Sequence, residues 1–522
     1  MLLPDKATYR PGETIRVELP VASVARTLTV ERLGRPVAAV EIPAGAGEAV
    51  LPLLSEGGYA VSLGPDHTAV EVLADPVARL RYGFVAAYQP ERDTEPVARL
   101  FRRLHLSAAQ FYDWAYRHAD LVGPAEYADP LDQPVSLDTV IRLADELRRA
   151  GTAPIGYAAV YGVGDGEWPQ WQHAALLRAD GQPHSLADFL RIVDPAHPEW
   201  LAHFVADLRK ATDVVGFAGF HLDQYGYPRY ADRADGARID VAASFCALID
   251  AVRLALPEAV LIFNNVNDFP VWATALRPQD VTYTEPWQPH DDLGDLAAIA
   301  TRARLLAPTR PAVLAAYQTA YDKLPVSVAE DVNRLTMATL FSHGATQLLA
   351  GEAGNVLVDP YYVRNHAADS STLDMLARWY DLLVAAGDIL LAPGAADITR
   401  SVTGALNDEI DVRSDAVPIR HEAVPGAVWR RVVDTPHGQV VHLINLTGQS
   451  DTSWDGAKQP IPDVTGLTLR VRRTGAALPV VRVADPDQAP TFQPIPVTAD
   501  GEHVVADLPP LHAWQIVLIS QD

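Results

Sequence analysis

The alternation of apolar and polar positions changes its rhythm twice along this chain of 522 residues. In residues 1–74, short segments such as 14–19, 28–32 and 59–63 alternate apolar and polar residues with period two. Short strands at regular spacing, separated by turn residues, are typical of a small sandwich of two sheets. We therefore predict an immunoglobulin-like β-sandwich at residues 1–74.

From residue 75 onward, strand-like runs alternate with segments of helical period. Leu137, Val140 and Ile141 begin the apolar face of one predicted helix, with Ser136 as its N-cap and Gly151 just after its end. Further helices are predicted at 199–210, 241–256 and 329–341. The predicted strands are 82–88, 153–161, 214–223, 259–264, 280–285, 312–317 and 347–350. This number and alternation fit a central (β/α)₈ TIM barrel at residues 75–393.

Beyond residue 393 the helical period disappears. The segments 426–433 and 439–446 alternate and bracket a turn at 436–438, and strand-like runs recur at 467–471 and 514–519. This pattern predicts an antiparallel β-sandwich at residues 394–522. The chain is therefore expected to be a multidomain α/β protein of three parts, because its length exceeds what one core accommodates.

Charge and composition exclude several classes of protein. The net charge of −24 argues against nucleic acid as a partner, and it fits either a neutral polymer or a simple need for solubility. No apolar run approaches the twenty or so residues that span a membrane. The N-terminus lacks an intact signal peptide, so the protein is either cytoplasmic or a secreted protein whose leader was removed. With one cysteine and no CxxC, HExxH or P-loop motif, we expect no metal and no cofactor.

Two acidic residues each follow an apolar run. Asp223 ends the segment 214–223, and Glu285 ends the segment 280–285. The carboxyl ends of barrel strands carry the chemistry of such folds, and two carboxylates delivered there are the minimal equipment of a glycosidase. Tyr283 and Trp287 flank Glu285, and aromatic walls raise the pKa of a carboxyl group. The alternatives are a helix-capping role for Asp223 and a surface ion pair for Glu285.

Other candidate residues could bind sugar hydroxyls or stack on sugar rings. In the segment 263–268, Asn265 is the favoured contact, whereas a turn rich in Asn and Asp explains Asn267 and Asp268 equally well. The candidates for substrate binding are Tyr112, Asp113, Trp114, His118, Tyr161, His221, Gln224, Asn265, Asn267, Trp287, Tyr317, His343 and Glu352.

Four barrel segments occur in an order that resembles glycoside hydrolase family 66, which contains endo-dextranases and cycloisomaltooligosaccharide glucanotransferases. These segments are 111–118, 216–224, 263–267 and 283–287, and the segments 5–13 and 442–448 also resemble the family. The resemblance implies a retaining mechanism on internal α-1,6 links of dextran that releases isomaltooligosaccharides. It makes Asp223 the nucleophile and Glu285 the acid/base. Ala218 and Pro286 depart from the family pattern, which bears on fine specificity more than on reaction type.

Several expectations stay open at this point. Cyclising members of the family usually carry a carbohydrate-binding module inserted in the barrel, and the spacing from Tyr82 to Pro393 leaves no room for one, which favours hydrolysis. A cycloisomaltooligosaccharide glucanotransferase remains the alternative, followed by a non-catalytic glucan-binding protein and by an enzyme for another α-glucan. The expected partner is an α-1,6-glucan, as polysaccharide or oligosaccharide. A monomer is favoured, and the resemblance favours secretion.

Overall fold

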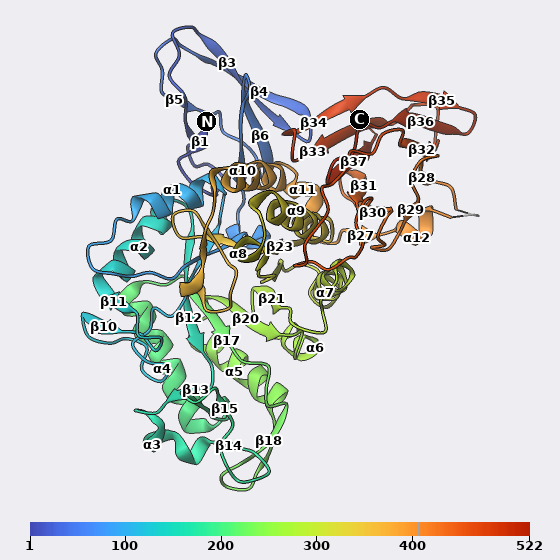
Figure 1. Ribbon diagram of the computed structural model, residues 1–522. Helices are drawn as coiled ribbons and strands as arrows, with labels where there is room; N and C mark the ends of the chain where they lie inside the picture. Colours follow the sequence, from blue (N-terminus) through green and yellow to red (C-terminus); the bar gives the residue numbers. More distant parts are fainter. Residues whose placement is uncertain (405–406, 522) are drawn as a thin grey trace.

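The computed structural model describes residues 1–404 and 407–521, and its centre is a curled 11-stranded sheet. The strands follow one another in the order β23-β22-β21-β20-β17-β12-β9-β8-β24-β25-β26. Figure 1 shows these strands surrounded by helices. The parallel strands are β8 (Tyr82–Val85), β9 (Ala108–Phe111), β12 (Ala153–Ala159), β17 (Gly219–Asp223), β20 (Val260–Val266), β21 (Val281–Glu285), β22 (Ala312–Leu314), β23 (Ala345–Gln347) and β24 (Ala350–Gly351). They are almost entirely buried, as parallel strands covered by helices must be.

The last parallel segment brings the sheet back to its first strand. β23 pairs with β22, and a few residues later β24 pairs with β8 through Gly351 and Phe84. A side chain at Gly351 would place its Cβ atom 2.2 Å from the carbonyl oxygen of Phe84. Glycine is therefore required where the two backbones meet.

Helices connect the parallel strands. The predicted helix after Ser136 is confirmed as α2 (Leu137–Arg149): the Ser136 hydroxyl accepts a hydrogen bond from the Thr139 amide, and Gly151 follows with a φ of +75°. The other main helices are α1 (Glu95–Arg103), α4 (Pro198–Val215), α5 (Val241–Ala255), α7 (Leu293–Leu306), α9 (Val326–Ser342) and α10 (Ser370–Ala385). Within the described ranges, no helix is both long enough and apolar enough to cross a bilayer.

Each end of the chain forms two small sheets around an apolar core of its own. The N-terminal sheets have the orders β1-β2-β5 and β4-β3-β6-β7, and the C-terminal ones are built on β27-β30-β31-β37-β33-β34 and β28-β32-β36-β35. The N-terminal strands are β1 (Leu3–Pro4), β2 (Arg16–Glu18), β3 (Arg26–Arg32), β4 (Arg35–Ile42), β5 (Glu48–Val50), β6 (Gly57–Leu63) and β7 (Asp66–Val72). The main C-terminal strands are β28 (Ile410–Arg413), β30 (Val428–Thr435), β31 (Gly438–Asn445), β32 (Thr468–Arg472), β33 (Val480–Asp485), β34 (Ala489–Ile495), β36 (His503–Asp507) and β37 (Trp514–Ser520). The short strands β27 (Ala396–Asp397) and β35 (Thr498–Asp500) complete these sheets, and β25 (Asn355–Val356) and β26 (His366–Ala367) complete the central one. Helix α10 contacts both β7 and β34, so both ends lie against the central part (Figure 1).

Candidate active site

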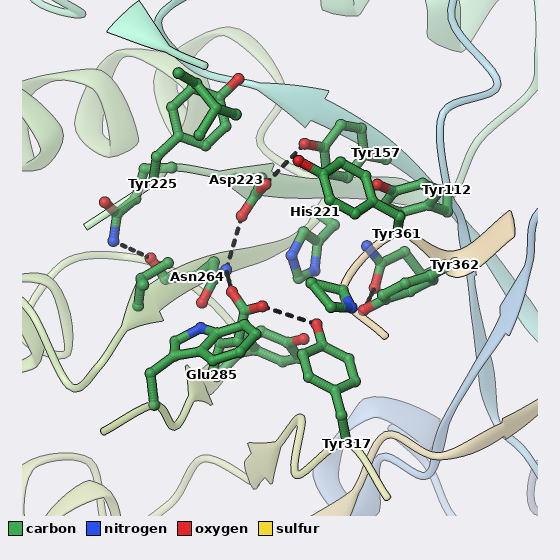
Figure 2. Close-up of a pocket in the computed structure, with 17 residues that line it drawn as sticks. Tyr112, Tyr157, His221, Asp223, Tyr225, Asn264, Glu285, Tyr317, Tyr361 and Tyr362 are labelled. Atoms are coloured by element: carbon green, nitrogen blue, oxygen red, sulfur yellow. Dashed lines mark hydrogen bonds between the residues drawn. The ribbon is translucent and has the colours of Figure 1, made fainter. Parts of the chain in front are cut away.

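A pocket of about 250 Å³ opens at the carboxyl ends of three neighbouring strands, β17, β20 and β21. Asp223 is the last residue of β17, and Glu285 is the last residue of β21. β20 lies between them and contributes Asn264 (Figure 2). The two predicted carboxylates therefore share one pocket, although 61 residues separate them in the sequence.

Strand register decides which side chains enter the pocket. Successive residues of a strand point to opposite faces, and partners in register point to the same face. Asn264 pairs with Tyr283 and Val266 with Glu285, and all four line the pocket. On the other side, His221 pairs with Tyr157, and both line the pocket as well.

One side-chain amide bridges the two carboxylates. The Asn264 Nδ2 atom donates to Asp223 Oδ1 at 2.7 Å and to Glu285 Oε2 at 2.9 Å. The second oxygen of Asp223 accepts from the Tyr157 hydroxyl at 2.7 Å, and the second oxygen of Glu285 accepts from the Tyr317 hydroxyl at 2.9 Å. Figure 2 shows this chain of contacts across the pocket. All of these donors are uncharged.

The surroundings push the pKa values of both acids upward. Burial, and then the negative charge of Asp223, raise the pKa of Glu285 to about 7, against hydrogen bonds from Asn264 and Tyr317 that lower it. Burial also raises the pKa of Asp223, and hydrogen bonds from Asn264, Tyr157 and the Gln224 amide oppose that effect. Glu285 therefore keeps a proton near neutral pH, while Asp223 ionises first. Two acids with separated roles are the usual basis of acid/base and nucleophilic chemistry.

Aromatic rings form the walls of the pocket. The ring of His221 stacks on that of Tyr157, with centroids 6.2 Å apart, and meets Tyr283 edge-on at 4.7 Å. Burial lowers the pKa of His221 to about 3, so this imidazole is neutral. On another wall, Tyr112 stacks on Tyr362 at 4.3 Å. No Lys or Arg is among the described residues that line the pocket, which suits a neutral ligand.

The structure brings five of the predicted binding residues to this pocket. They are Tyr112, His221, Gln224, Trp287 and Tyr317. The amide of Gln224 is fully engaged, because its nitrogen donates to backbone carbonyls of Asn264 and Phe269 and its oxygen accepts from the Gly226 amide. Gln224 therefore holds the loop after β17, whereas the aromatic residues present open faces.

Three other predicted residues after β9 lie outside the pocket lining, although the neighbouring Tyr112 is part of it. Trp114 is fully buried, and its indole donates to the Tyr157 carbonyl at 3.1 Å. Asp113 is buried too, and burial together with the charges of Asp129 and Asp223 raises its pKa well above the usual value. His118 is also buried, which lowers its pKa to about 4. None of these three lines the pocket.

Asn265 is the clearest correction, because it points to the opposite face of β20 from Asn264. Its amide nitrogen donates to the carbonyls of Phe263 and Tyr283, and its oxygen accepts from the Thr274 hydroxyl at 2.6 Å. The side chain is completely buried and both of its N–H groups are already engaged, so it does not face the pocket. The adjacent Asn264 occupies the place expected of Asn265.

Two other predicted residues support loops around the pocket without lining it. The Tyr161 hydroxyl donates to the Tyr227 carbonyl and accepts from the Tyr225 amide, which fixes the loop after β17. Asn267 adopts a φ of +53°, and its side-chain oxygen accepts from the Trp287 amide. Both residues thereby position a neighbour that does line the pocket.

The last two predicted residues lie elsewhere. His343 follows α9 and packs against Trp429 of the C-terminal part, with ring centroids 5.2 Å apart. Glu352 is buried, accepts hydrogen bonds from the Ala86 and Ala87 amides, and pairs with Arg92. Both side chains make contacts between structural elements and lie outside the pocket lining, so neither is placed to contact a substrate bound there.

Several pocket residues were not among the predicted ones. They are Gln110, Tyr157, Leu186, Tyr225, Asn264, Val266, Tyr283, Pro360, Tyr361 and Tyr362. Residues two positions apart in a strand point to the same face, as His221 and Asp223 do. The same rule predicts that Tyr283 enters the pocket, because it lies two residues before Glu285. Tyr157 and Asn264 can be found only from the register between strands.

Two acids at strand ends, with uncharged partners and aromatic walls around them, form the kind of site with which glycoside hydrolases cleave a glycosidic bond. Residues 4–518 match the family model described as "Glycosyl hydrolase family 66". The chain therefore belongs to glycosyl hydrolase family 66, which confirms the resemblance noted in the sequence.

Known proteins of related sequence and structure agree with this assignment. A cycloisomaltooligosaccharide glucanotransferase of Niallia circulans is 25% identical over 332 residues, which cover 58% of this chain and 33% of that relative. A dextranase of Streptococcus salivarius is 23% identical over 570 residues, covering 90% of this chain and 68% of the relative. The crystal structure of a Paenibacillus sp. cycloisomaltooligosaccharide glucanotransferase complexed with cycloisomaltoheptaose superposes with a TM-score of 0.89 at 18% identity, covering 99% of each chain. This last likeness shows the fold.

No group of three or more His, Cys, Asp or Glu side chains in residues 1–404 and 407–521 is arranged to hold a metal ion.

Proposed function

We propose that this protein is a retaining, endo-acting glycoside hydrolase that cuts internal α-1,6 links of dextran into isomaltooligosaccharides. The observation that carries the proposal is the Asn264 bridge between Asp223 and Glu285. Asp223 Oδ1 and Glu285 Oε2 accept hydrogen bonds from the same nitrogen, at 2.7 and 2.9 Å. These two oxygens therefore cannot lie farther apart than the two distances added together. That limit is compatible with the spacing of about 5–5.5 Å between the carboxyl groups of a retaining glycosidase.

In the proposed reaction, Glu285 donates its proton to the glycosidic oxygen while an Asp223 oxygen attacks the anomeric carbon. The bond to the leaving sugar breaks, and a glucosyl ester forms on Asp223. Glu285, now ionised, removes a proton from a water molecule that attacks the same carbon. The ester bond breaks, a free reducing end forms, and both acids return to their starting states.

The lining of the pocket supports a neutral sugar as the ligand. Aromatic rings such as those of Tyr112, Tyr157 and Tyr317 form its walls, and no Lys or Arg is among the described residues that line it. Neutral sugars bind through hydroxyl groups and pack their apolar faces on aromatic rings. The dextran specificity itself rests on the names of the relatives.

A cycloisomaltooligosaccharide glucanotransferase is the second candidate, supported by the name of the Niallia circulans relative. It shares the first step, after which the far end of the same glucan, in place of water, takes the glucosyl group. A non-catalytic glucan-binding protein is the third candidate, and it requires that the paired acids have no chemical role.

We also propose a three-part architecture: an immunoglobulin-like sandwich at residues 1–74, a closed (β/α)₈ barrel at residues 75–393 and a β-sandwich at residues 394–522. The pairing of residues 345–351 with β22 at one end and β8 at the other supports closure. The separate apolar cores of the two ends support independent sandwiches.

The test is product analysis on dextran with the native protein beside Asp223→Ala and Glu285→Ala. Asp145→Ala, on an exposed turn of α2, serves as a control that should behave like the native protein. Linear isomaltooligosaccharides from the native protein, and none from the two site variants, are expected. Cyclic products would favour the transferase, and unchanged dextran viscosity would favour a binding protein.

A further inference from the structure

A second hollow of about 530 Å³ adjoins the candidate active site. It shares Trp287, Tyr317 and Pro360 with the active-site pocket, so the two form a continuous depression. We call it the outer hollow. Trp287 keeps 39% of its surface exposed here, which is unusual for so large an apolar side chain.

The far wall of the outer hollow comes from the C-terminal part of the chain. Residues 453–456, in the loop after β31, line it together with Trp287. This segment is held firmly against the barrel loops: the Trp454 amide donates to the Asp291 carbonyl at 3.0 Å, and the Asp455 carboxylate accepts from the Thr319 hydroxyl at 2.5 Å. The wall is therefore a preformed surface attached to the loops after β21 and β22.

The lining of the outer hollow favours an uncharged ligand rich in hydroxyl groups. Asp291, Asp359 and Asp455 provide carboxylate acceptors, Ser453 adds a hydroxyl, and the Trp287 ring offers a face for stacking. No Lys, Arg or His is among the described residues that line it, so an anionic ligand would be repelled. Neutral sugars fit these features, since their hydroxyls donate to carboxylates and their apolar faces pack on aromatic rings.

Its position relative to Glu285 determines which part of the substrate it would hold. Pro286 and Trp287, directly after Glu285, both line the outer hollow. Tyr317, whose hydroxyl donates a hydrogen bond to Glu285, lines both the outer hollow and the active-site pocket. The proposed acid/base must contact the oxygen of the leaving sugar. The hollow therefore continues from the point at which the leaving sugar is bound.

We infer that the outer hollow binds glucosyl residues on the leaving-group side of the cleaved bond, and that the C-terminal segment 453–456 forms part of this site. The inference rests on the proposed function, because it uses Glu285 as the acid/base. It assigns a substrate-binding role to a part of the chain that lies outside the barrel. The same site would receive a sugar that replaces water as the acceptor.

The test blocks the outer hollow without touching the pocket. Ser453→Trp fills the hollow from the C-terminal wall, and Ser453→Leu fills it less. Ser450→Trp, on an exposed position of the same loop outside the hollow, is the matched control. Each variant is assayed on dextran and on 4-nitrophenyl α-isomaltoside, whose small leaving group does not extend into the hollow.

The expected result is selective. Ser453→Trp should lower kcat/KM on dextran by about tenfold or more, mainly through KM, because the loss of one well-packed contact has that size. Release of 4-nitrophenol should stay within twofold of native, and Ser453→Leu should give a smaller loss on dextran. Unchanged dextran cleavage by both Ser453 variants, or equal losses on both substrates, would overturn the inference. If the native protein cleaves neither substrate, the proposed function itself fails.

Discussion

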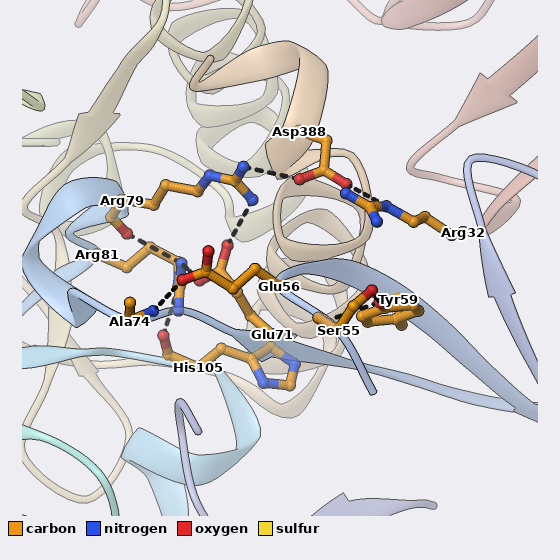
Figure 3. A network of polar contacts seen from close by, with 10 residues as sticks. All are labelled: Arg32, Ser55, Glu56, Tyr59, Glu71, Ala74, Arg79, Arg81, His105 and Asp388. Carbon is orange, nitrogen blue, oxygen red and sulfur yellow. Dashed lines mark hydrogen bonds and ion pairs between the residues drawn. The ribbon is translucent and has the colours of Figure 1, made fainter. Parts of the chain in front are cut away.

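Two groups of buried acidic side chains in this molecule have opposite surroundings. In the candidate active site, Asp223 and Glu285 contact only uncharged donors. At the junction between the N-terminal sheets and the central part of the molecule, Glu71 and Asp388 contact arginines instead (Figure 3). Arg81 pairs with Glu71 at 2.6 Å, and neither side chain is exposed.

The pKa values follow this difference. Burial opposes ionisation of Asp388, but the guanidinium groups of Arg79 and Arg32 outweigh burial and hold its pKa below the usual value. At Glu285, burial and the neighbouring charge of Asp223 act in the same direction and raise the pKa to about 7. Buried acids with cationic partners thus stay ionised and hold elements together. Buried acids without such partners keep a proton available at the cost of some stability.

The largest expected effect separates activity from stability in the active site. Asp223→Asn and Glu285→Gln should each lower kcat on dextran by about 10⁴-fold or more, as the loss of a nucleophile or acid does. Neither should lower the melting temperature, because each replaces a buried ionisable group by an amide of the same shape. Activity assays and thermal melts of the same samples check this, and a melting temperature well below native would contradict it.

The opposite outcome is expected at the arginine-paired acids. Arg81→Met should lower the free energy of unfolding by about 3–5 kcal/mol, because the buried Glu71 side chain loses its closest cationic partner. Arg16→Met, which breaks an ion pair with Glu48 that is half exposed on both sides, should cost less than about 1 kcal/mol. Denaturant melts measure both variants. Similar losses from the two substitutions would show that burial does not distinguish these pairs.

Two adjacent residues of β20, Asn264 and Asn265, should differ in whether their loss changes activity or stability. Asn264→Ala removes a donor that favours the ionised forms of both acids, so their pKa values should rise and the acidic limb of the kcat/KM profile should move to higher pH. We expect an activity loss of about 10–100-fold, since one hydrogen bond to each of the two acids is lost. Asn265→Ala should instead cost about 1–3 kcal/mol of stability and leave the profile in place. The contrary finding would be a shifted profile for Asn265→Ala alone.

A further expected effect is the pH dependence of stability. The pKa of Glu285 is raised on folding, so its contribution to stability is full below its ordinary value of about 4.5 and is lost as pH rises through about 7. Asp388 has a lowered pKa, so its contribution is present above about 3.8 and is lost as pH falls further. Melting temperatures of native and Glu285→Gln protein should therefore agree below pH 4.5 and diverge by pH 8, with the variant higher. Parallel curves would contradict the raised pKa.

Much of the arrangement could be predicted from local sequence because it depends on local physics. The apolar period and the Ser136 cap predict α2, and the apolar runs before Asp223 and Glu285 predict strands that end at those residues. Helices α1, α7 and α10 were not predicted, although α10 is buried over most of its length. The second half of α10, residues 379–385, is buried on every side, so this half lacks the one-sided pattern by which an amphipathic helix is recognised.

The finer features of the site depend on contacts between distant segments. Asn264 and Asn265 are chemically identical and adjacent, and only the register of β20 with β21 decides which one meets the carboxylates. Tyr157 enters the pocket because it pairs with His221. Trp114 and Glu352 belong to polar and aromatic types that suit sugar binding, yet their partners are backbone groups and an arginine of this chain. Residue type alone cannot separate a ligand contact from an internal one.

The most direct test of the central claim is to find the atom that carries the glucosyl group. In Glu285→Gln, α-isomaltosyl fluoride should still react, because fluoride leaves without help from an acid, while the missing base slows release of the ester. Mass spectrometry of digested protein should then find one isomaltosyl group on the peptide that contains Asp223. Attachment to another residue, or continued fluoride release with no adduct, would contradict the account of Asp223 as nucleophile and Glu285 as acid/base.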